Sequence, residues 1–265
     1  MSPRKSFDEL ARINVGNLVD YAVKNLHLDD ADVVYATNTL LSLLGLTEPA
    51  DAAETYDFYT VLGELSAYAV RKGLCEESDR LLFETKIMGV LTPVPSRVIE
   101  TFDNIAAREG SMKAAKWLED LSEKSAYIRR PDTDRNIQWE YDNPRGKIVI
   151  TINLAKPEKT PEEVRRAKEA KTGYPKCLLC AENVGFAGNA AHPARQTLRT
   201  IPFELDGEEW FMQFSPYVYF DEHIIAISRE HRPMCVSEAT FRRMLDFVDL
   251  FPGYFIGSNA ALPIV

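Results

Sequence analysis

Residues 199–214 read RTIPFELDGEEWFMQF. Two segments of strand-forming residues, 199–205 and 208–214, flank the pair Asp206-Gly207. A two-residue type I′ turn prefers this pair, because both of its central positions need a positive φ. The pattern predicts an antiparallel β-hairpin and so assigns β structure to the second half of the chain.

The segments around this hairpin divide the chain into a helical part and a strand-rich part. Before residue 130, apolar residues keep helical spacing, and Ser6 with Glu9 forms a capping box. Further strands are expected at 137–141 and 147–154, around a turn at 142–146, and at 217–220, 223–228 and 254–257; a helix should run from Ser237 to Val248. Upstream helices are expected at 6–26, 30–44, 56–69, 76–89, 96–108 and 111–125. We therefore predict an α+β fold, with a helical N-terminal region over 1–130 and an antiparallel sheet with flanking helices over 131–265.

The composition excludes several classes of protein. The 265 residues include 40 acidic and 31 basic residues, which gives a net charge of −9. A nucleic-acid-binding protein usually carries a basic excess, so this class is disfavoured. No apolar run approaches the roughly 20 residues of a membrane span, and the N-terminus lacks a signal peptide. We expect a soluble, cytoplasmic protein with reduced thiols.

Cys177-Leu178-Leu179-Cys180 is the strongest local motif. A C-x-x-C turn places two thiols near enough to share one tetrahedral zinc ion. A redox pair normally lies between a strand and a helix, whereas here a loop follows the motif. The residues alone leave a metal site, a redox pair and two inert buried thiols open.

The other ligands of a metal site must come from histidines elsewhere in the chain. His231 leaves a predicted strand and enters a loop, where its side chain can turn toward a site, and His192 is a second candidate. His223 lies within a predicted strand and His27 follows a helix, so both are expected to be structural. The sequence contains no Walker loop, G-x-G-x-x-G motif or Ser-His-Asp order.

Several segments together resemble one enzyme family, the galactose-1-phosphate uridylyltransferases of the second, mainly bacterial class. The resemblance covers nearly the whole chain in order. It rests on TNTLLSLLGL (37–46), ITINLAKPEK (150–159), YPKCLLCAENVGF (174–186), HPARQTLRTIPF (192–203), FSPYVYFDEHIIAISREHRPM (214–234) and FPGYFIGSNAALPIV (251–265).

This resemblance implies a histidine-triad-like half-barrel sheet and a two-step reaction. UDP-glucose gives its uridylyl group to a histidine, and galactose 1-phosphate then takes this group to become UDP-galactose. A covalent intermediate of this kind splits one displacement into two easier ones. The resemblance also suggests a homodimer. A non-catalytic nucleotide-binding or interaction module with the same fold is the alternative.

The sequence departs from the family at its nucleophile. In the family, this residue lies in a His-x-His motif shortly after the segment that matches SNAALPIV, and the sequence ends at Val265. None of the four histidines matches the nucleophile. We therefore expect these residues to be the N-terminal part of an enzyme, to lack a catalytic residue of their own and to be inactive alone.

The resemblance extends to individual residues of two candidate sites. Cys177 and Cys180 match a metal-binding pair in the other class of the family, and His231 falls where a third ligand is expected, so zinc is the expected ion.

The second candidate site that the resemblance implies is the nucleotide site. Asp221 and Glu222 fall on the strand that meets the uridine ribose, and Asn259 matches a residue near the UMP phosphate. Arg195 and Arg199 are phosphate partners by chemistry alone, since a guanidinium fits phosphate; solvated surface charges are the alternative for both.

Overall fold

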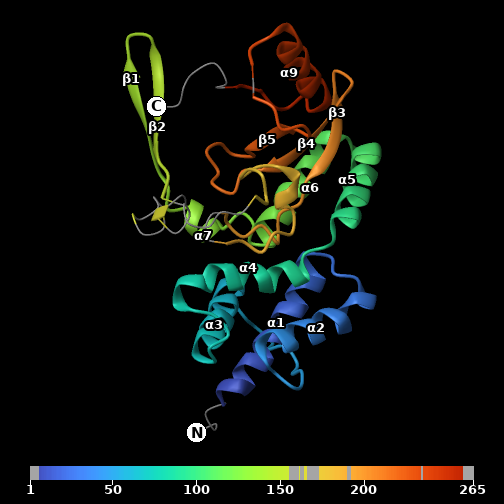
Figure 1. The fold of residues 1–265 in the computed structure, drawn as a ribbon, viewed down its shortest axis with the longest axis vertical. Coiled ribbons are helices and arrows are strands. Elements are labelled where there is room, and N and C mark those ends of the chain that lie inside the picture. The colour runs from blue at the N-terminus through green and yellow to red at the C-terminus, as the bar shows by residue number, and fades with distance from the viewer. Residues whose placement is uncertain are drawn as a thin grey trace.

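The computed structural model describes residues 6–154, 161, 164–165, 173–189, 192–233 and 235–258. Helices occupy the first half and antiparallel strands follow (Figure 1), so the predicted α+β class is confirmed. No described helix is both long and apolar enough to cross a bilayer. The helices of the first half are α1 (Phe7–Asn25), α2 (Asp30–Leu44), α3 (Phe58–Arg71), α4 (Arg80–Leu91), α5 (Pro95–Glu109), α6 (Ser111–Lys124) and α7 (Arg130–Thr133), with the 3-10 helix η1 (Glu77–Asp79) before α4.

Local sequence signals explain where these helices begin and end. The Ser6 hydroxyl accepts the Glu9 N–H at 3.1 Å, and the Ser6 N–H donates to the Glu9 carboxylate at 3.2 Å, which completes the predicted capping box. Gly45 ends α2 with a φ of +66°, a left-handed conformation that glycine adopts without steric cost.

A continuous apolar core joins the helices to the sheet. Helix α1 packs against α2 and α3, and α3 packs against α4. The cluster includes Leu18, Leu65 and Leu118 from the helices and Met212 from the sheet, all of them fully buried. The helices of the first half form a helical layer, of which α1–α4 lie below the sheet in Figure 1 and α5 lies beside β3, which it contacts.

The larger sheet has the strand order β3 (Ile201–Leu205), β4 (Glu208–Phe214), β5 (Ile224–Ser228). Asp206 and Gly207 between the first two have φ values of +50° and +73°, which confirms the predicted hairpin turn. Strand β4 is central and mostly buried, whereas β3 and β5 form the two edges among the described residues. Helix α9 (Glu238–Leu250) covers β3, with the ring centroids of Phe203 and Phe247 5.9 Å apart.

Two predicted strands are wrong. Residues 217–220 form the end of a turn and a bend, and Val218 has a φ of +45°, outside the range of a regular strand. Residues 254–257 do alternate between half-buried and exposed side chains, but they form no ladder with any described strand. An alternation of apolar and polar residues indicates that one side of a segment is buried. It does not show that the segment pairs with another strand.

The second sheet is a hairpin of β1 (Ile137–Asn143) and β2 (Gly146–Ile152), as predicted. Its turn is fixed by the Asn143 side chain, which accepts the Arg145 N–H at 2.8 Å. At its base the side-chain amides of Asn136 and Asn153 both donate to the Tyr217 carbonyl. The hairpin extends away from the rest of the molecule (Figure 1).

Candidate functional site

The two cysteines lie on a tight loop that the buried side chain of Asn183 holds in shape. Asn183 belongs to the 3-10 helix η2 (Ala181–Asn183), which directly follows Cys180. Its amide nitrogen donates to the carbonyl oxygens of Cys177 at 2.8 Å and Cys180 at 2.9 Å. The Cys180 carbonyl also accepts the backbone N–H of Asn183 at 3.0 Å, so the side chain of Asn183 adds the link from η2 to the Cys177 carbonyl.

The sulfur atoms of this loop accept hydrogen bonds from nearby nitrogens. The Cys180 N–H donates to Cys177 Sγ at 3.1 Å, and Asn183 Nδ2 lies 3.4 Å from Cys180 Sγ. Such donors favour a thiolate, the form of cysteine that binds metal. Burial has the larger effect and raises the pKa of the Cys180 thiol, which donates to the Cys177 carbonyl at 3.4 Å.

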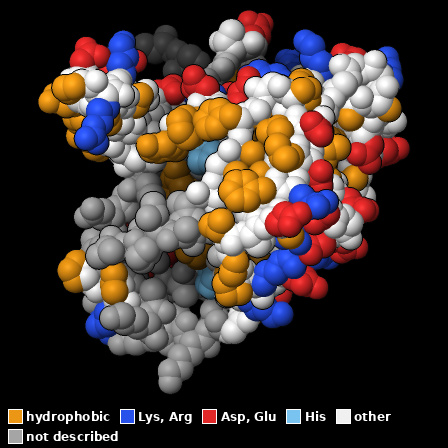
Figure 2. All heavy atoms as spheres, turned by 90° about the horizontal axis from the view of Figure 1, so that it is seen from above, with side chains coloured by type: hydrophobic (Ala, Val, Ile, Leu, Met, Phe, Trp, Pro, Cys, Tyr) orange, Lys and Arg blue, Asp and Glu red, His pale blue; other side chains and the backbone are white. Residues whose placement is uncertain are grey.

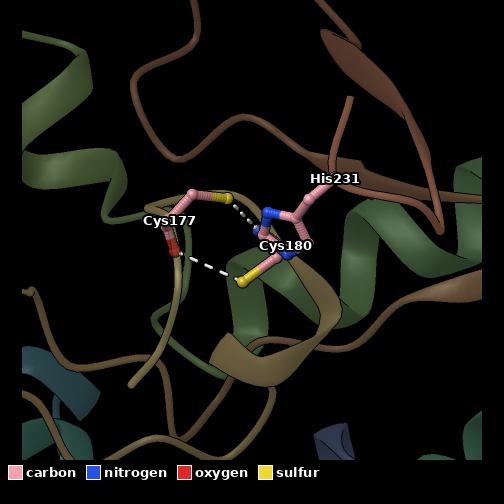
Figure 3. A group of neighbouring side chains, drawn as sticks. All are labelled: Cys177, Cys180 and His231. Carbon is pink, nitrogen blue, oxygen red and sulfur yellow. Dashed lines mark hydrogen bonds between the residues drawn. The ribbon is translucent and has the colours of Figure 1, made fainter. Parts of the chain in front are cut away.

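His231 completes a group of three potential metal ligands. It follows the end of β5, and its ring points toward the two sulfur atoms (Figure 3). One ligand atom from each of Cys177, Cys180 and His231 lies within 4.8 Å of the other two. The three side chains that we expected to converge therefore do so, from a loop and from a strand end far apart in the sequence.

The spacing and chemistry of this group fit zinc. Tetrahedral bonds of about 2.0–2.3 Å separate neighbouring ligand atoms by roughly 3.3–3.8 Å, so closure needs a shift of about 1 Å. The donor set consists of two sulfurs and an imidazole nitrogen. Zinc binds such donors more readily than magnesium or calcium does. One coordination position is left for a fourth ligand.

Glu182 borders the group. Its carboxylate accepts the Lys176 N–H at 2.8 Å and the Cys180 thiol at 3.7 Å. The hydrogen bond from Lys176 is the main reason why the pKa of Glu182 lies below its ordinary value, and the nearby charge of His231 adds to this effect. The carboxylate therefore places a negative charge beside the ligands.

A large cleft opens from this group of ligands along β5. Its volume is about 1440 Å³, and its walls include all five residues of β5 and side chains of α9. Cys177, Cys180 and His231 line it together with Asp221 and Glu222. Figure 2 shows apolar side chains around a hollow in which histidine side chains are visible. Ligand pockets usually have a volume of about 300–1,000 Å³. This cleft is therefore large enough for a ligand of nucleotide size.

Glu222 is held in place at the cleft by residues from two other segments. It has a φ of +54°, and its carboxylate accepts the Tyr254 hydroxyl at 3.2 Å. The ammonium group of Lys116 lies 3.7 Å away and also donates to the buried Glu119 at 2.6 Å. The carboxylate of Glu222 is thus oriented by the helical layer, while Asp221 beside it is exposed.

Comparison with known sequences identifies the family. A family described as galactose-1-phosphate uridyl transferase, N-terminal domain, matches residues 27–233. The chain belongs to this family. The resemblance seen in the sequence is therefore confirmed.

Several bacterial proteins with the name galactose-1-phosphate uridylyltransferase are similar to this chain. The protein of that name from Caldanaerobacter subterraneus subsp. tengcongensis is 45% identical over 262 residues, which are 96% of this chain and 50% of that protein. Those of Fusobacterium nucleatum subsp. nucleatum and Bacillus subtilis are 43% and 42% identical, over 95% and 94% of this chain and 50% of each relative. The chain spans about half the length of these relatives. No solved structure matches it.

The structure does not bring every candidate site residue to the cleft. The Arg195 guanidinium lies over the Tyr127 ring, 5.7 Å from its centroid, and is not part of the cleft wall. Asn259 lies outside the described residues. His192 packs edge-on against Phe186 and does not join the ligand group.

Arg199 is a structural residue, so its expected role toward phosphate is wrong. The side chain is buried, and its donors bind the backbone carbonyls of Thr92 at 3.0 Å and Gln196 at 2.9 Å, among others. Burial lowers the pKa of Arg199 to about 10. Its guanidinium joins the loop between α4 and α5 to the start of β3 and has no donor directed at the cleft.

Sequence reasoning missed three residues of the site. Asn183 binds the cysteine loop through its side-chain amide, and the Tyr254 hydroxyl orients Glu222. His223 lines the cleft, although it was expected to be purely structural. The sequence offered one signal for His223, because it begins a predicted strand directly after the candidate acids Asp221 and Glu222. Nothing in the local sequence distinguishes Asn183 or Tyr254, because their roles depend on contacts across the fold.

Proposed function

We propose that this chain supplies the metal- and nucleotide-binding part of an enzyme that exchanges uridylyl groups between UDP-glucose and galactose 1-phosphate. One observation carries this proposal: in a member of the uridylyltransferase family, three potential metal ligands and two adjacent acids line the same cleft. The two-step chemistry passes through a uridylyl-histidine.

The proposed reaction is balanced in each step. A neutral imidazole nitrogen attacks the α-phosphorus of UDP-glucose, a P–N bond forms, and the P–O bond to glucose 1-phosphate breaks. A phosphate oxygen of galactose 1-phosphate then attacks the same phosphorus, the P–N bond breaks, and UDP-galactose leaves. Covalent catalysis needs a histidine free of its proton and donors for the phosphate oxygens.

In this proposal Cys177, Cys180 and His231 hold zinc, which links the cysteine loop to the end of β5. A structural zinc ion stabilises the fold that binds it and would fix one end of the cleft. The three residues bind the ion and so hold the cysteine loop and the end of β5 together.

Asp221 and Glu222 are proposed to accept hydrogen bonds from the ribose hydroxyls. A carboxylate accepts from two hydroxyls and cannot donate, which matches a ribose better than a phosphate. Asn259 and Arg195 are proposed to bind nearer the phosphates. Arg195 would have to leave the Tyr127 ring in order to reach them.

We further propose that residues 1–130 act as a helical scaffold and that residues 131–265 carry the site. The protein would work in the cytoplasm as a homodimer, where its four free cysteines stay reduced. By themselves the 265 residues are proposed to bind nucleotide without turnover, because none of their four histidines matches the nucleophile of the family.

The second candidate function is a non-catalytic nucleotide-binding or interaction module of the same fold. A fusion distinguishes the two. The part of the Caldanaerobacter relative that this chain does not cover is joined after Val265, and release of glucose 1-phosphate from UDP-glucose is measured. Turnover that requires both parts supports the enzyme. A folded fusion that binds UDP-glucose without turnover supports the module.

A further inference from the structure

Glu222 has a strained backbone conformation in the wall of the cleft. It lies in the turn before β5 and has a φ of +54°, in the left-handed region. A residue with a Cβ pays a steric cost there and keeps this conformation only where its surroundings hold it. Such residues are common at ligand-binding sites. The contacts of the Glu222 side chain therefore identify what holds this part of the cleft in place.

The two carboxylate oxygens of Glu222 face different partners. Oε2 accepts the Tyr254 hydroxyl at 3.2 Å, and Oε1 lies 3.7 Å from the Lys116 ammonium. Burial and the nearby carboxylate raise the pKa of Tyr254, so its hydroxyl keeps the proton that it donates. Tyr254 lines the cleft beside Glu222, whereas Lys116 stands behind the wall. Since each carboxylate oxygen has two lone pairs, both oxygens can still accept from a ligand.

Lys116 is itself anchored in the helical layer. Its ammonium donates to Glu119, one turn further along α6, at 2.6 Å. Glu119 is only 3% exposed, and Arg130 of α7 lies 3.9 Å from its other oxygen. The hydrogen bond to Glu119 is the main reason why the pKa of Lys116 lies above its ordinary value, so the ammonium stays charged. A buried carboxylate therefore fixes the cation whose other neighbour is the acid in the cleft.

Helix α6 also fixes the segment that carries Tyr254. The Ser111 hydroxyl, at the first residue of the helix, donates to the Leu250 carbonyl at 2.5 Å. A Cβ atom at Gly253 would lie only 2.4 Å from Cε of Met112, so the chain at this point packs directly on the helix. One helix therefore positions both the hydroxyl and the ammonium that hold the acid in the cleft.

We propose that Lys116 is a positioning residue that sets the ribose specificity of the nucleotide site through Glu222, a role that rests on the proposed function of Glu222 as a ribose acceptor. A site built to bind a hydroxyl discriminates against an analogue that lacks it, because the partner of that hydroxyl is then left unpaired. This discrimination is strongest when the acceptor is held in the binding geometry before the ligand arrives. Lys116 provides that geometry without a contact to the nucleotide.

Calorimetric titration of the whole chain with UDP, 2′-deoxy-UDP and 3′-deoxy-UDP tests this role. The wild type should prefer UDP at least about tenfold over the analogue that lacks the hydroxyl bound by Glu222, and Glu222→Ala identifies this analogue by removing the preference. Lys116→Met should reduce the same preference to about threefold or less, and Lys116→Arg should restore it. Lys113→Met, which removes an exposed lysine one turn earlier on α6, is the control for charge and should keep the full preference.

A double variant separates this role from a purely structural one. Lys116→Met leaves the buried Glu119 without its ammonium, which destabilises the fold. Lys116→Met combined with Glu119→Gln removes the unpaired charge, so this variant should fold and still show the reduced preference for UDP. UDP binding with the full preference in the double variant, or a wild type that binds UDP and both analogues equally, would overturn the role of Lys116 alone. Absence of UDP binding by the folded wild type would contradict the proposed function, and the role of Lys116 with it.

Discussion

The side-chain amide of Asn183 donates to the carbonyl oxygen of Cys177 at 2.8 Å and so closes the loop that carries both cysteines. We expect Asn183→Ala to leave the part-buried Cys177 carbonyl and the Cys180 sulfur without this donor, whereas the Cys180 carbonyl keeps the backbone N–H of residue 183. The unfolding free energy should fall by about 1–3 kcal/mol, and zinc affinity should fall with it. Chemical denaturation measures the first. Asn104→Ala, at an exposed position of α5, should change stability by no more than about 0.5 kcal/mol.

Zinc binding should require both thiols of the loop. Cys177→Ser and Cys180→Ser should each abolish stoichiometric zinc, whereas Cys75→Ser, in the helical layer, should retain it. Affinity should fall as the pH falls, because the metal must displace thiol protons and burial raises the pKa of Cys180. Elemental analysis and cobalt absorption spectra at several pH values check this. Full zinc content in both loop variants would refute the site.

Asp221→Ala should weaken binding of UDP-glucose by about 1–3 kcal/mol, since ribose hydroxyls lose an acceptor. Asp103→Ala removes an exposed acid of α5 that does not line the cleft, and serves as the control for net charge. Calorimetric titration compares the two. Equal affinity in both folded variants would remove Asp221 from the nucleotide site.

Arg199 should matter for stability and not for phosphate binding. Arg199→Met should lower the unfolding free energy by about 1–3 kcal/mol, because it leaves buried carbonyls such as that of Thr92 without a donor. The affinity of the folded variant for UDP-glucose should stay within about twofold of the wild type, which is about 0.4 kcal/mol. A stable variant with lost nucleotide binding would restore the role that its chemistry suggests.

His223 should make stability depend on pH. Burial lowers the pKa of His223 below its ordinary value of 6.5, so in the window below pH 6.5 the unfolded chain takes up the proton first. Stability is therefore lost as the pH falls from 6.5 toward the folded-state pKa, with a slope of up to about 1.4 kcal/mol per pH unit for one proton. His223→Gln should reduce this slope, and His27→Gln, at an exposed position, should not. Denaturation curves between pH 5 and 7, about the range over which an ordinary histidine titrates, measure it.

Local patterns predicted the parts of the molecule that depend on local chemistry. The turn pair Asp206-Gly207 located the β3–β4 hairpin because its φ requirements are specific, and the C-x-x-C motif located the candidate ligands. Contacts across the fold were not predictable in the same way. The burial of Arg199 and the irregular path at Tyr254 depend on which segments meet in the fold. The alternation of residues 254–257 suggested a strand because a half-buried segment shows the same alternating pattern whether or not it pairs with another strand.

Calorimetric titration of UDP-glucose into the zinc-loaded 265-residue chain tests the central claim most directly. We predict saturable binding that UDP competes for and glucose 1-phosphate alone does not, with no release of glucose 1-phosphate over the titration. Binding should weaken in Asp221→Ala. Absence of binding by the folded, zinc-loaded chain, or turnover at about 1 s⁻¹, a rate ordinary for enzymes, would contradict the account.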